Sequence, residues 1–572
     1  MKFLQKTENR YLFSWLWLIT IITSLLLMFY VVPQSGTSTI VELDFSTFSL
    51  FPFSVPIVID QFSITFRVTV LTISSWVALF RVFYIHNDPY GTRFISVLIL
   101  FVAAINALIF VPRILGIILG WDGLGIVSFL LVIYYRRSES LAAGLITALR
   151  NRIGDSLFIL FLGFSTTISS WHFSDSLLGS LQLYLLWFLL IGRITKRAQI
   201  PFSAWLPAAI AAPTPVSTLV HSSTLVTAGV YVLFRFRSSI RGLPIFFLIV
   251  SSTITLLIAG ITATIERDLK KIVALSTLRQ LGVILFALSN EIPDICFFHL
   301  ITHAYFKATI FLCVGTLIFT GSGLQDYRFA GKSWYKIPVV SSWLIICCRC
   351  LRGLPFTSGF FSKDLIVESC LWNDTSIIGI IYTFISVLLT AIYSTRIIII
   401  IAFSKSFNSA ESINDSSNNY ATIPITGIGV IALISGWLLQ NSILSFNYFI
   451  LTPGSYKNIT ILIVITGFLI AVIIYAIVKK PFVIKNNYLT WFFKKMWFLT
   501  EVRGNPIRNT SLSISIKIYR SIEKSWISLF WGQKVKYAIY YLNYGTRKRQ
   551  THMLGKIILL RVLIFLIFVL LK

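Results

Sequence analysis

The sequence predicts an all-α, polytopic membrane protein, a bundle of about 14 to 16 transmembrane helices. Of its 572 residues, 56% are hydrophobic and 12% are charged, whereas soluble domains carry roughly 25% charged residues. Apolar runs of about 20 residues, the length that crosses a bilayer, recur along almost the whole chain. Prolines, glycines and ionisable side chains interrupt some of these runs, which predicts broken helices at membrane depth.

The formal net charge of +28 is strongly basic, so the position of the Lys and Arg residues decides what it means. Many of them lie in short loops or at the ends of apolar runs, as in Tyr134–Arg137 and Thr546–Arg549. This is the positive-inside pattern of membrane proteins. The chain has neither a basic tail nor an aromatic-interleaved RNA motif, so we exclude nucleic-acid binding.

The apolar runs give the order of the membrane helices. No A-x-A-like cleavage site follows Tyr11–Val32, so we expect this run to be retained as the first helix. The stretch Val41–Ile64 is expected to loop outside the membrane. The later expected spans are Val68–Tyr84, Phe94–Val111, Ile114–Tyr134, Leu141–Phe164, Leu181–Ile200, Trp205–Phe234, Leu243–Thr264, Ile272–Leu288, Ile295–Phe319, Val339–Phe361, Ile377–Phe403, Ile423–Leu439 and Ile459–Ile477.

The C-terminal part differs from the rest of the chain. Apolar residues recur every four positions within Ser513–Tyr544 while Lys, Arg and Glu lie between them, which is typical of an amphipathic helix on a membrane surface or packed on its own protein. Met553–Leu571 then forms a terminal span, and Ser406–Asn419 is a polar linker. We expect the parts 1–92 (N-terminal helices and loop), 93–405 (core), 406–480 (peripheral helices), 481–552 (lateral amphipathic region) and 553–572 (terminal anchor).

Two expected helices carry charges inside apolar runs, where a charge costs at least about 2.5 to 3.5 kcal/mol. Asp122 lies in IILGWDGLGIV, whose glycines let another helix approach closely; alternatively it lies at a loop end. Lys196 can release its proton when buried and regain it beside a carboxylate. Arg193 and Arg197 stay charged and are interpreted as interfacial anchors.

Two proline-containing segments predict helix breaks. Pro213 and Pro215 precede His221 in PTPVSTLVHSST, and their missing N–H groups leave carbonyls, hydroxyls and an imidazole that together can relay protons through water. The alternative is a histidine satisfied within the core. A second break at Pro355 is followed by Lys363 and Asp364, which can exchange a proton with either side of the membrane, or lie at the surface end of a helix.

His299, His303 and Lys307 occur at i, i+4 and i+8 in one apolar helix. They share one face and span about 12 Å along the helix axis. A zinc site is the competing interpretation, but no H-E-x-x-H arrangement is present and the lysine would repel a cation. The clustered Cys347, Cys348 and Cys350 are interpreted as small buried side chains.

In this order, GWDGLG, NRIGD (Asn151–Asp155), Lys196–Pro207, PTPVSTLVHSST, DLKKIVALST (Asp268–Thr277), HLITHAYFKA and GFFSKD resemble the chain 5 family of NADH–ubiquinone oxidoreductase, the antiporter-like subunits of respiratory complex I. The resemblance covers roughly Ile95–Arg396. The amphipathic stretch and the last apolar segment are similar to that family's lateral helix and anchor. By contrast, CCRCLR (Cys347–Arg352) is more polar than the family's usual apolar run.

The resemblance implies a role for each site residue. Asp122 stands where the family more often has Glu and is the acidic partner of Lys196, with a reach one methylene shorter. His221 follows on the broken helix. The triplet on the apolar helix forms the central relay, and Lys363, beside Asp364, is the terminal exchange lysine. Pairing and unpairing of the lysine would drive a proton along this series.

The resemblance also implies that electrons pass from NADH to ubiquinone in other subunits, which bind the NADH, FMN, iron–sulfur clusters and ubiquinone, so this chain would carry no cofactor, metal or redox centre. Its partners would be the other membrane-arm subunits, neighbouring antiporter-like subunits included. The location would be the mitochondrial inner membrane rather than a bacterial plasma membrane. Two alternatives remain: a subunit of a multisubunit sodium/proton antiporter without redox coupling, and a scaffold whose buried charges only fix helix packing.

Overall fold

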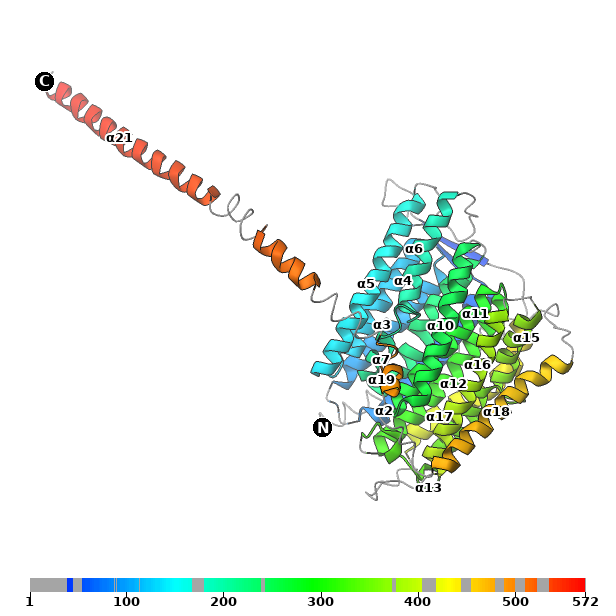
Figure 1. Ribbon diagram of the computed structural model, residues 1–572. Coiled ribbons are helices and arrows are strands. Elements are labelled where there is room, and N and C mark those ends of the chain that lie inside the picture. Colours follow the sequence, from blue (N-terminus) through cyan, green and yellow to red (C-terminus); the bar gives the residue numbers. More distant parts are fainter. Residues whose placement is uncertain are drawn as a thin grey trace. The chain divides into compact units, whose positions relative to one another are not determined.

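The computed structural model describes residues 39–44, 54–86, 88, 90–112, 114–166, 180–237, 242–321, 323–372, 377–403, 418–443, 454–478, 488–498, 510–521 and 534–570. The chain forms two compact units, Met1–Trp497 and Phe498–Lys572. In the first, long helices pack side by side (Figure 1). The predicted helical membrane fold is confirmed. Tyr11–Val32 and nearly all of the polar linker Ser406–Asn419 lie outside the described residues.

The stretch expected to be a loop, Val41–Ile64, differs from the prediction. Strands β1 (Thr39–Asp44) and β2 (Ser54–Ile59) form an antiparallel hairpin in which Thr39 pairs with Ile59. Both segments are rich in the β-branched residues Thr, Val and Ile, which favour strands. Helix α2 then begins at Gln61, earlier than predicted, because the carboxylate of Asp60 caps its first turn.

The described N-terminal helices overlap the predicted spans, with ends that differ by several residues. The residues of α2 are mostly buried, whereas α3 and α5 keep one apolar side exposed. Neighbours in sequence are packing partners, α3 with α4, α4 with α5 and α5 with α6. Their bounds are α2 Gln61–Tyr84, α3 Gly91–Phe110, α4 Ile114–Val132, α5 Ser138–Thr166 and α6 Ser180–Lys196.

The predicted span Trp205–Phe234 is a series of short pieces. Ala212 adopts an extended conformation before Pro213, so the helix stops there and restarts after the proline. A π-helix follows, in which the Thr224 hydroxyl donates to the Leu219 carbonyl at 2.6 Å. The pieces are α7 Trp205–Ala208, η3 Ala209–Ala211, α8 Thr214–Val216, η4 Ser217–Thr224 and α9 Leu225–Arg235.

Three long helices follow, α10 (Leu243–Ile265), α11 (Leu269–Ser289) and α12 (Pro293–Thr320). The apolar stretches of α11 and α12 are completely buried by the rest of the protein. Helix α12 packs against α2, α11, α14, α17 and the π-helix η4. The centre of the first unit is therefore the helix that carries the predicted histidine–lysine face.

The remaining elements surround this centre. The predicted span Val339–Phe361 is interrupted, because α14 ends at Arg352 and a turn separates it from the π-helix η7. In order, the elements are η6 Tyr327–Phe329, α13 Ser333–Lys336, α14 Pro338–Arg352, η7 Phe360–Asp364, α15 Leu365–Trp372, α16 Ile377–Ile398, η8 Ile399–Phe403, α17 Asn419–Ile443, α18 Gly454–Val478 and α19 Tyr488–Lys494.

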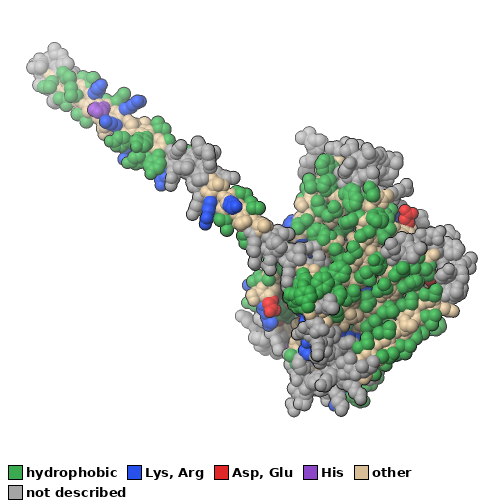
Figure 2. Space-filling view, viewed as in Figure 1, with side chains coloured by type: hydrophobic (Ala, Val, Ile, Leu, Met, Phe, Trp, Pro, Cys, Tyr) green, Lys and Arg blue, Asp and Glu red, His purple; other side chains and the backbone are tan. Residues whose placement is uncertain are grey.

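Much of the described outer surface of the first unit is apolar. Figure 2 shows hydrophobic side chains over a large part of one face, and large apolar residues of α10, α16 and α18 are exposed, including Phe246, Ile381 and Leu462. Such a surface suits lipid rather than water. Among the described residues, 9 helices are long and apolar enough to cross a membrane. The predicted total of about 14 to 16 stays a prediction.

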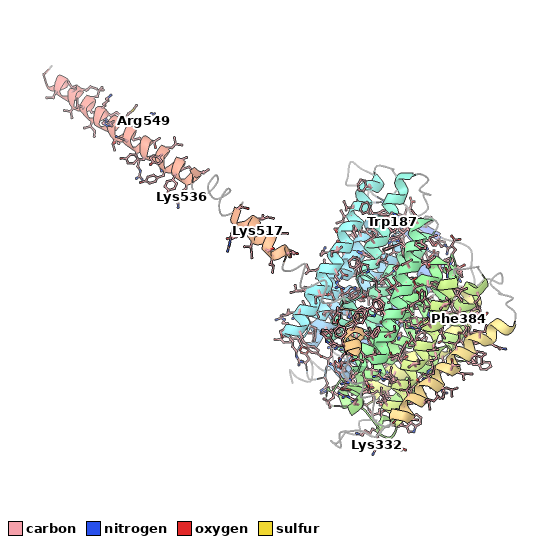
Figure 3. All side chains as sticks on the ribbon, viewed as in Figure 1. Trp187, Lys332, Phe384, Lys517, Lys536 and Arg549 are labelled. Carbon is pink, nitrogen blue, oxygen red and sulfur yellow. The ribbon has the colours of Figure 1, made fainter. Side chains whose placement is uncertain are left out.

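The second unit contains α21 (Lys534–Leu570), a single continuous helix. The boundary expected between residues 552 and 553 falls inside it. Residues 510–518 form a further helical segment, and Ile522, Trp526 and Phe530 lie outside the described residues. Lys517, Lys536 and Arg549 project from these helices (Figure 3), and the expected amphipathic helix over Ser513–Tyr544 stays a prediction.

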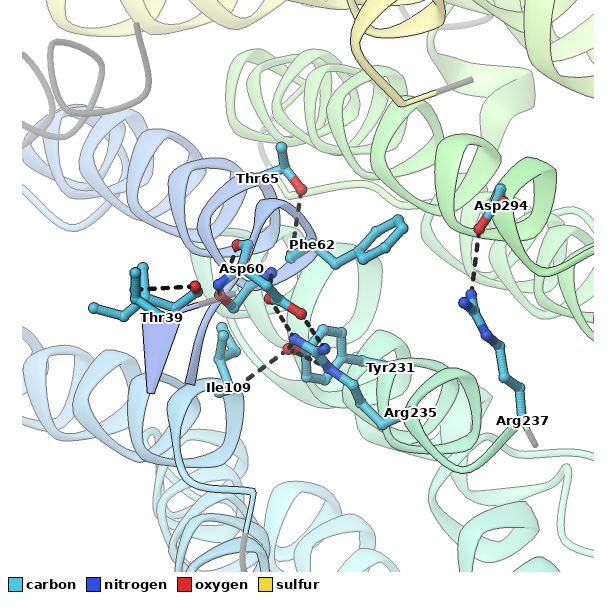
Figure 4. Close-up of polar contacts among 11 residues, drawn as sticks. Thr39, Asp60, Phe62, Thr65, Ile109, Tyr231, Arg235, Arg237 and Asp294 are labelled. Carbon is cyan, nitrogen blue, oxygen red and sulfur yellow. Dashed lines mark hydrogen bonds and ion pairs between the residues drawn. The ribbon is translucent and has the colours of Figure 1, made fainter. Parts of the chain in front are cut away.

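An ion pair joins the start of α2 to the end of α9 (Figure 4). Both carboxylate oxygens of Asp60 accept hydrogen bonds from Arg235, one of them at 2.8 Å from Nη2. The same guanidinium donates through Nε to the Tyr231 hydroxyl at 2.9 Å, and that hydroxyl donates to the Ile109 carbonyl of α3 at 3.2 Å. The pair therefore ties the broken-helix segment to the N-terminal helices.

We expect Asp60→Asn to lower the free energy of unfolding by about 2 kcal/mol, the cost of leaving a mostly buried guanidinium without its anion. Burial raises the pKa of Asp60, but the hydrogen bond and charge of Arg235 hold it below its usual value of 3.8. The loss of unfolding free energy relative to the wild type should have its full size above pH 3.8. It should disappear as the pH falls through the lowered pKa of Asp60. Thermal unfolding of the detergent-solubilised protein measures both effects.

Asp294→Asn is the matched control, because its bond to Arg237 is longer, 3.3 Å, and the arginine side chain is 45% exposed. This exposed pair should contribute less than about 1 kcal/mol. Equal losses in the two variants would contradict the role given to the Asp60 pair.

Candidate functional site

Ionisable side chains are buried along the middle of the first unit. Removing a charge from water costs free energy unless other groups in the protein stabilise it. The partners of each buried ionisable side chain therefore indicate its role. Each of the following is at most 6% exposed: Asp155, Lys196, His221, Lys270, Arg279, His299, His303, Lys307, Lys363 and Asp364.

The first of these sites lies at the end of α6. The Lys196 amine donates to the Trp121 carbonyl at 2.5 Å and lies 3.9 Å from the centre of the Trp121 ring. Its nearest acidic oxygen is Oδ1 of Asp155, at 4.0 Å. Asp122, the partner expected from the sequence, acts electrostatically on Lys196 but forms no ion pair with it within 4.0 Å among the described residues. Two carboxylates therefore share one amine, and the closer one was not predicted.

The close contact of α5 with α6 places Asp155 there. A Cβ at Gly154 would lie 2.2 Å from the Thr195 hydroxyl and 2.8 Å from the Gly192 carbonyl, so only glycine permits this approach. Within 4.0 Å the amine has only the carboxylate of Asp155 among the described residues, while Asp122 acts on it from further away. The motif NRIGD, in which a carboxylate directly follows a glycine, was the available sequence signal.

The prediction that Arg193 and Arg197 are interfacial anchors is wrong, because both side chains are completely buried. Arg193 donates to the Val232 carbonyl at 3.0 Å and stacks over Phe236, 4.4 Å from its ring centre. Arg197 donates to the Gly229 carbonyl. Both arginines bind backbone carbonyls of α9, so they fix α6 against the broken helix.

The broken helix holds the second site. His221 lies in the π-helix η4 and is 2% exposed, with its ring 6.1 Å from that of Trp205. Lys270 reaches across from α11 and donates to the carbonyls of Ile210, at 2.8 Å, and Ala212. These carbonyls face the interruption before Pro213 and lack helical donors. Sequence analysis did not single out Lys270, although it belongs to the motif DLKKIVALST.

The predicted face of α12 is the third site. The Lys307 amine binds the Ser276 hydroxyl of α11. Nδ1 of His299 lies 2.9 Å from the Ser362 hydroxyl and Nε2 lies 3.4 Å from Oε1 of Gln280. The rings of His299 and His303 are 6.3 Å apart. Lys307 thus contacts α11, and His299 contacts both α11 and η7.

This environment does not favour the zinc alternative. Polar groups of the protein already engage both ring nitrogens of His299. In the part of the chain that the structure describes, no three His, Cys, Asp or Glu side chains gather as a metal site requires. The six cysteines are free and buried, as expected for small core side chains.

Lys363 and Asp364 form the fourth site, in η7. The Lys363 amine donates to the Arg352 carbonyl at 3.1 Å, the Leu351 carbonyl at 3.4 Å and the Thr390 hydroxyl at 3.2 Å. It therefore lies at the C-terminal end of α14, where the helix dipole favours a cation. Both Lys363 and Asp364 are buried, so neither lies at a surface end of a helix.

Glycine permits this geometry. Gly353, which has a φ of +83°, caps the C-terminal end of α14. A Cβ at Gly359 would lie 1.7 Å from the Cys350 carbonyl oxygen, so η7 touches the end of α14 only because no side chain intervenes there. The turn that contains Pro355 returns the chain to this contact.

The third and fourth sites are connected. Ser362, which contacts His299, directly precedes Lys363. Arg279 of α11 donates to the Ser386 carbonyl and acts electrostatically on both Lys307 and Lys363. Sequence analysis missed this arginine because α11 reads as an ordinary apolar helix around it. The arrangement suits the movement of a proton between amines, imidazoles and hydroxyls.

Two family profiles match the chain. The family described as NADH:quinone oxidoreductase/Mrp antiporter, transmembrane, matches residues 112–390, which include all four sites. The family described as NADH dehydrogenase subunit 5 C-terminus matches residues 393–572. Together they cover the core and the C-terminal part.

Curated relatives cover most of the chain. NADH-ubiquinone oxidoreductase chain 5 of Lumbricus terrestris is 37% identical over 87% of this chain and 88% of its own length. The same protein of Locusta migratoria is 38% identical over 85% of this chain and 86% of its own length.

A solved structure shares the fold. A chain of the Mrp complex from Dietzia sp. superposes with a TM-score of 0.68 at 20% identity, covering 86% of this chain; this chain spans 58% of that one. At this identity the likeness concerns the fold alone. The identity, coverage and two matching family profiles place the chain in the family of NADH–ubiquinone oxidoreductase chain 5.

Proposed function

We propose that this chain is the proton-translocating membrane subunit of an NADH:ubiquinone oxidoreductase. The observation that carries the proposal is the series of buried amines, Lys196, Lys307 and Lys363. Among the described residues, Lys196 is the only one of these three lysines whose amine has a carboxylate oxygen within 4.0 Å. Buried amines held by hydroxyls and carbonyls can exchange protons, whereas a structural ion pair holds its charge.

The cycle starts at Lys196. The amine keeps its proton while the carboxylates of Asp155 and Asp122 neutralise it, and releases it when they move away or become protonated. The broken segment with His221 and Lys270 follows, and its hydroxyls and free carbonyls can bind the waters that relay the proton. The proton then reaches Lys307 and the two histidines of α12.

Release occurs at Lys363. The amine lies against the end of α14, and the carboxyl group of Asp364 is the adjacent proton acceptor on η7. The π-helix η7 lacks the regular hydrogen bonds of an α-helix. A small change in the turn that contains Pro355 can therefore alter the access of water to Lys363.

Under this proposal the energy comes from electron transfer in other subunits. NADH, FMN, the iron–sulfur clusters and ubiquinone are bound there, and this chain has no redox centre of its own. Its partners are the other membrane-arm subunits, including neighbouring antiporter-like subunits. The chain resides in the mitochondrial inner membrane.

The test is reconstitution of the complex purified through this chain. We expect it to oxidise NADH with a ubiquinone analogue and to move protons into sealed vesicles, as a pH-sensitive dye inside them reports. Transport that requires sodium ions but no NADH would favour the antiporter alternative. If NADH oxidation does not co-purify with the chain, the proposal is wrong.

A further inference from the structure

Arg279 is a buried cation to which the proton series gives no role. It lies on α11, is completely buried and donates through Nη2 to the Ser386 carbonyl of α16. Its Nε and Nη1 atoms have no hydrogen-bond partner among the described residues. A guanidinium stays charged, and one bond to a neutral carbonyl does not offset the cost of burying that charge. Arg279 is therefore unlike an ordinary structural tie between helices.

On α11, Arg279 lies one turn from the residue that holds Lys307. The Lys307 amine binds the Ser276 hydroxyl. Residues three apart on a helix are surface neighbours, with about 5 to 6 Å between their Cβ atoms. The residue after Arg279, Gln280, contacts His299. The arginine therefore starts from the same stretch of α11 that contacts both the lysine and the first histidine of α12.

On α16, the guanidinium reaches the turn that holds Lys363. A helical carbonyl points along the axis toward the amide four residues later, so the Ser386 carbonyl points toward Thr390. The Thr390 hydroxyl accepts a hydrogen bond from the Lys363 amine at 3.2 Å. Arg279 and Lys363 thus contact α16 within one turn of each other.

The side chain of Arg279 is held in place by its surroundings. Helix α10 packs against both α11 and α16. A Cβ at Gly260 of α10 would lie 3.3 Å from Cβ of Leu389 and 3.6 Å from Cδ of Arg279, so glycine lets α16 and the arginine side chain pack closely against α10. Three helices enclose the side chain, and the charge stays where it is while protons move past it.

The fixed charge acts on both amines. Charges interact strongly in the interior of a protein, where the effective dielectric constant is far below that of water. A permanent cation makes the protonated form of a nearby amine less favourable. The other ionisable groups near Arg279 and the two amines are His299, His303, Cys348, Asp364 and Tyr393. Of these groups, only Asp364 is a carboxyl group.

Two other buried arginines provide a contrast. Arg193 and Arg197 also bind backbone carbonyls, which belong to α9. Neither of them is among the charges that act on Lys196, although both lie close to it in the sequence. An arginine can therefore tie two helices without acting on a neighbouring amine, whereas Arg279 does both.

We infer that Arg279 is a fixed cation that prevents Lys307 and Lys363 from holding protons at the same time. Uptake of a proton by Lys307 is then coupled to release of the proton on Lys363, and one proton enters this part of the series for each one that leaves it. Arg279 carries no proton itself and acts only through the two amines. The inference rests on the proposed function, because it concerns the same proton series.

The test is the pH profile of proton flux in Arg279→Gln. Flux per NADH oxidised is measured in vesicles that contain the purified complex, and the flux of the Lys307→Met complex is subtracted at each pH to isolate this chain. Glutamine keeps a donor for the Ser386 carbonyl and removes the charge. Both amines then hold their protons more firmly, so the decline of flux at alkaline pH should move up by on the order of one pH unit. Flux at neutral pH should fall by about tenfold, because proton release becomes slower.

Two further variants separate charge from structure. Arg279→Lys keeps a cation at this position and should retain a profile close to that of the wild type. Arg396→Gln is the matched control, because Arg396 is a buried arginine of α16 that also binds two backbone carbonyls. It is not among the charges that act on either amine. Its loss should lower the melting temperature of the complex and leave the pH profile unchanged.

The inference is overturned if the profile of Arg279→Gln matches the wild type, or if Arg279→Lys or Arg396→Gln shifts as much. Loss of flux at every pH without a shift would indicate a purely structural arginine and overturns it too. If Arg279→Gln does not assemble, Arg279→Met, which leaves no buried polar group, is measured in its place. Failure of both to assemble also shows a structural role. Failure of the proposed function gives a different result: Lys307→Met then pumps like the wild type, and the subtraction leaves no flux.

Discussion

Replacing Lys307 with Met is expected to stop proton translocation through this chain and to leave the assembled complex at least as stable as the wild type. The amine is completely buried and binds the Ser276 hydroxyl. That hydroxyl also donates to the Val273 carbonyl at 2.6 Å, so it keeps a partner in the variant. Methionine has a similar shape and no charge to bury, so the substitution should be neutral or stabilising.

The loss of function has a separate cause. Methionine cannot carry a proton, and the section of α12 around Lys307 offers no other amine. Removing a positioned proton carrier typically costs about 10²-fold to 10⁴-fold in rate. Proton flux per NADH oxidised, measured with a pH-sensitive dye in vesicles that contain the purified complex, should fall to this extent. The melting temperature of the complex provides the stability measurement.

Lys332→Met is the matched control, because Lys332 is exposed at the far end of the same unit. It should leave both proton flux and stability unchanged. If the chain is only a scaffold, Lys307→Met should leave proton flux intact and should affect only assembly or stability. Normal pumping by a fully assembled Lys307→Met complex would therefore favour the scaffold.

Asp155→Asn is expected to reduce proton flux by at least about tenfold, and by more than Asp122→Asn. Asp155 is the carboxylate 4.0 Å from the Lys196 amine. At that distance and an effective dielectric constant of about 20, the attraction is on the order of 4 kcal/mol. Its loss leaves the more distant Asp122 alone to bring a proton onto Lys196. The same vesicle assay measures both variants.

The comparison between the two variants is the informative part, because each removes one carboxylate from the same amine. The double variant should resemble Asp155→Asn with a small further loss if the pairing in the structure is the working one. A larger effect of Asp122→Asn would mean that the amine turns toward Asp122 during the cycle, as the sequence analysis predicts. Arg152, 59% exposed and 3.6 Å from Asp155, provides a control: Arg152→Gln should have little effect.

Much of the fold follows from local properties of the sequence. The length of the apolar runs predicted the positions of most of the described helices. The observed α12, Pro293–Thr320, includes the predicted span Ile295–Phe319. The shared face of His299, His303 and Lys307 follows from helix geometry alone. The hairpin before α2 was not predicted, because pairing of Thr39–Asp44 with Ser54–Ile59 depends on contacts between segments.

The amino-acid sequence by itself determined that the chain is a membrane helical bundle, where its helices are interrupted, and which titratable residues lie in them. Only the tertiary structure decided which groups meet. It brought Asp155 rather than Asp122 to Lys196, buried Arg193 and Arg197 against α9, and placed Lys270 at the broken helix. The physical reason is that periodicity fixes the direction of a side chain on its own helix, whereas partners on other helices depend on close approaches such as that of Gly154 to α6.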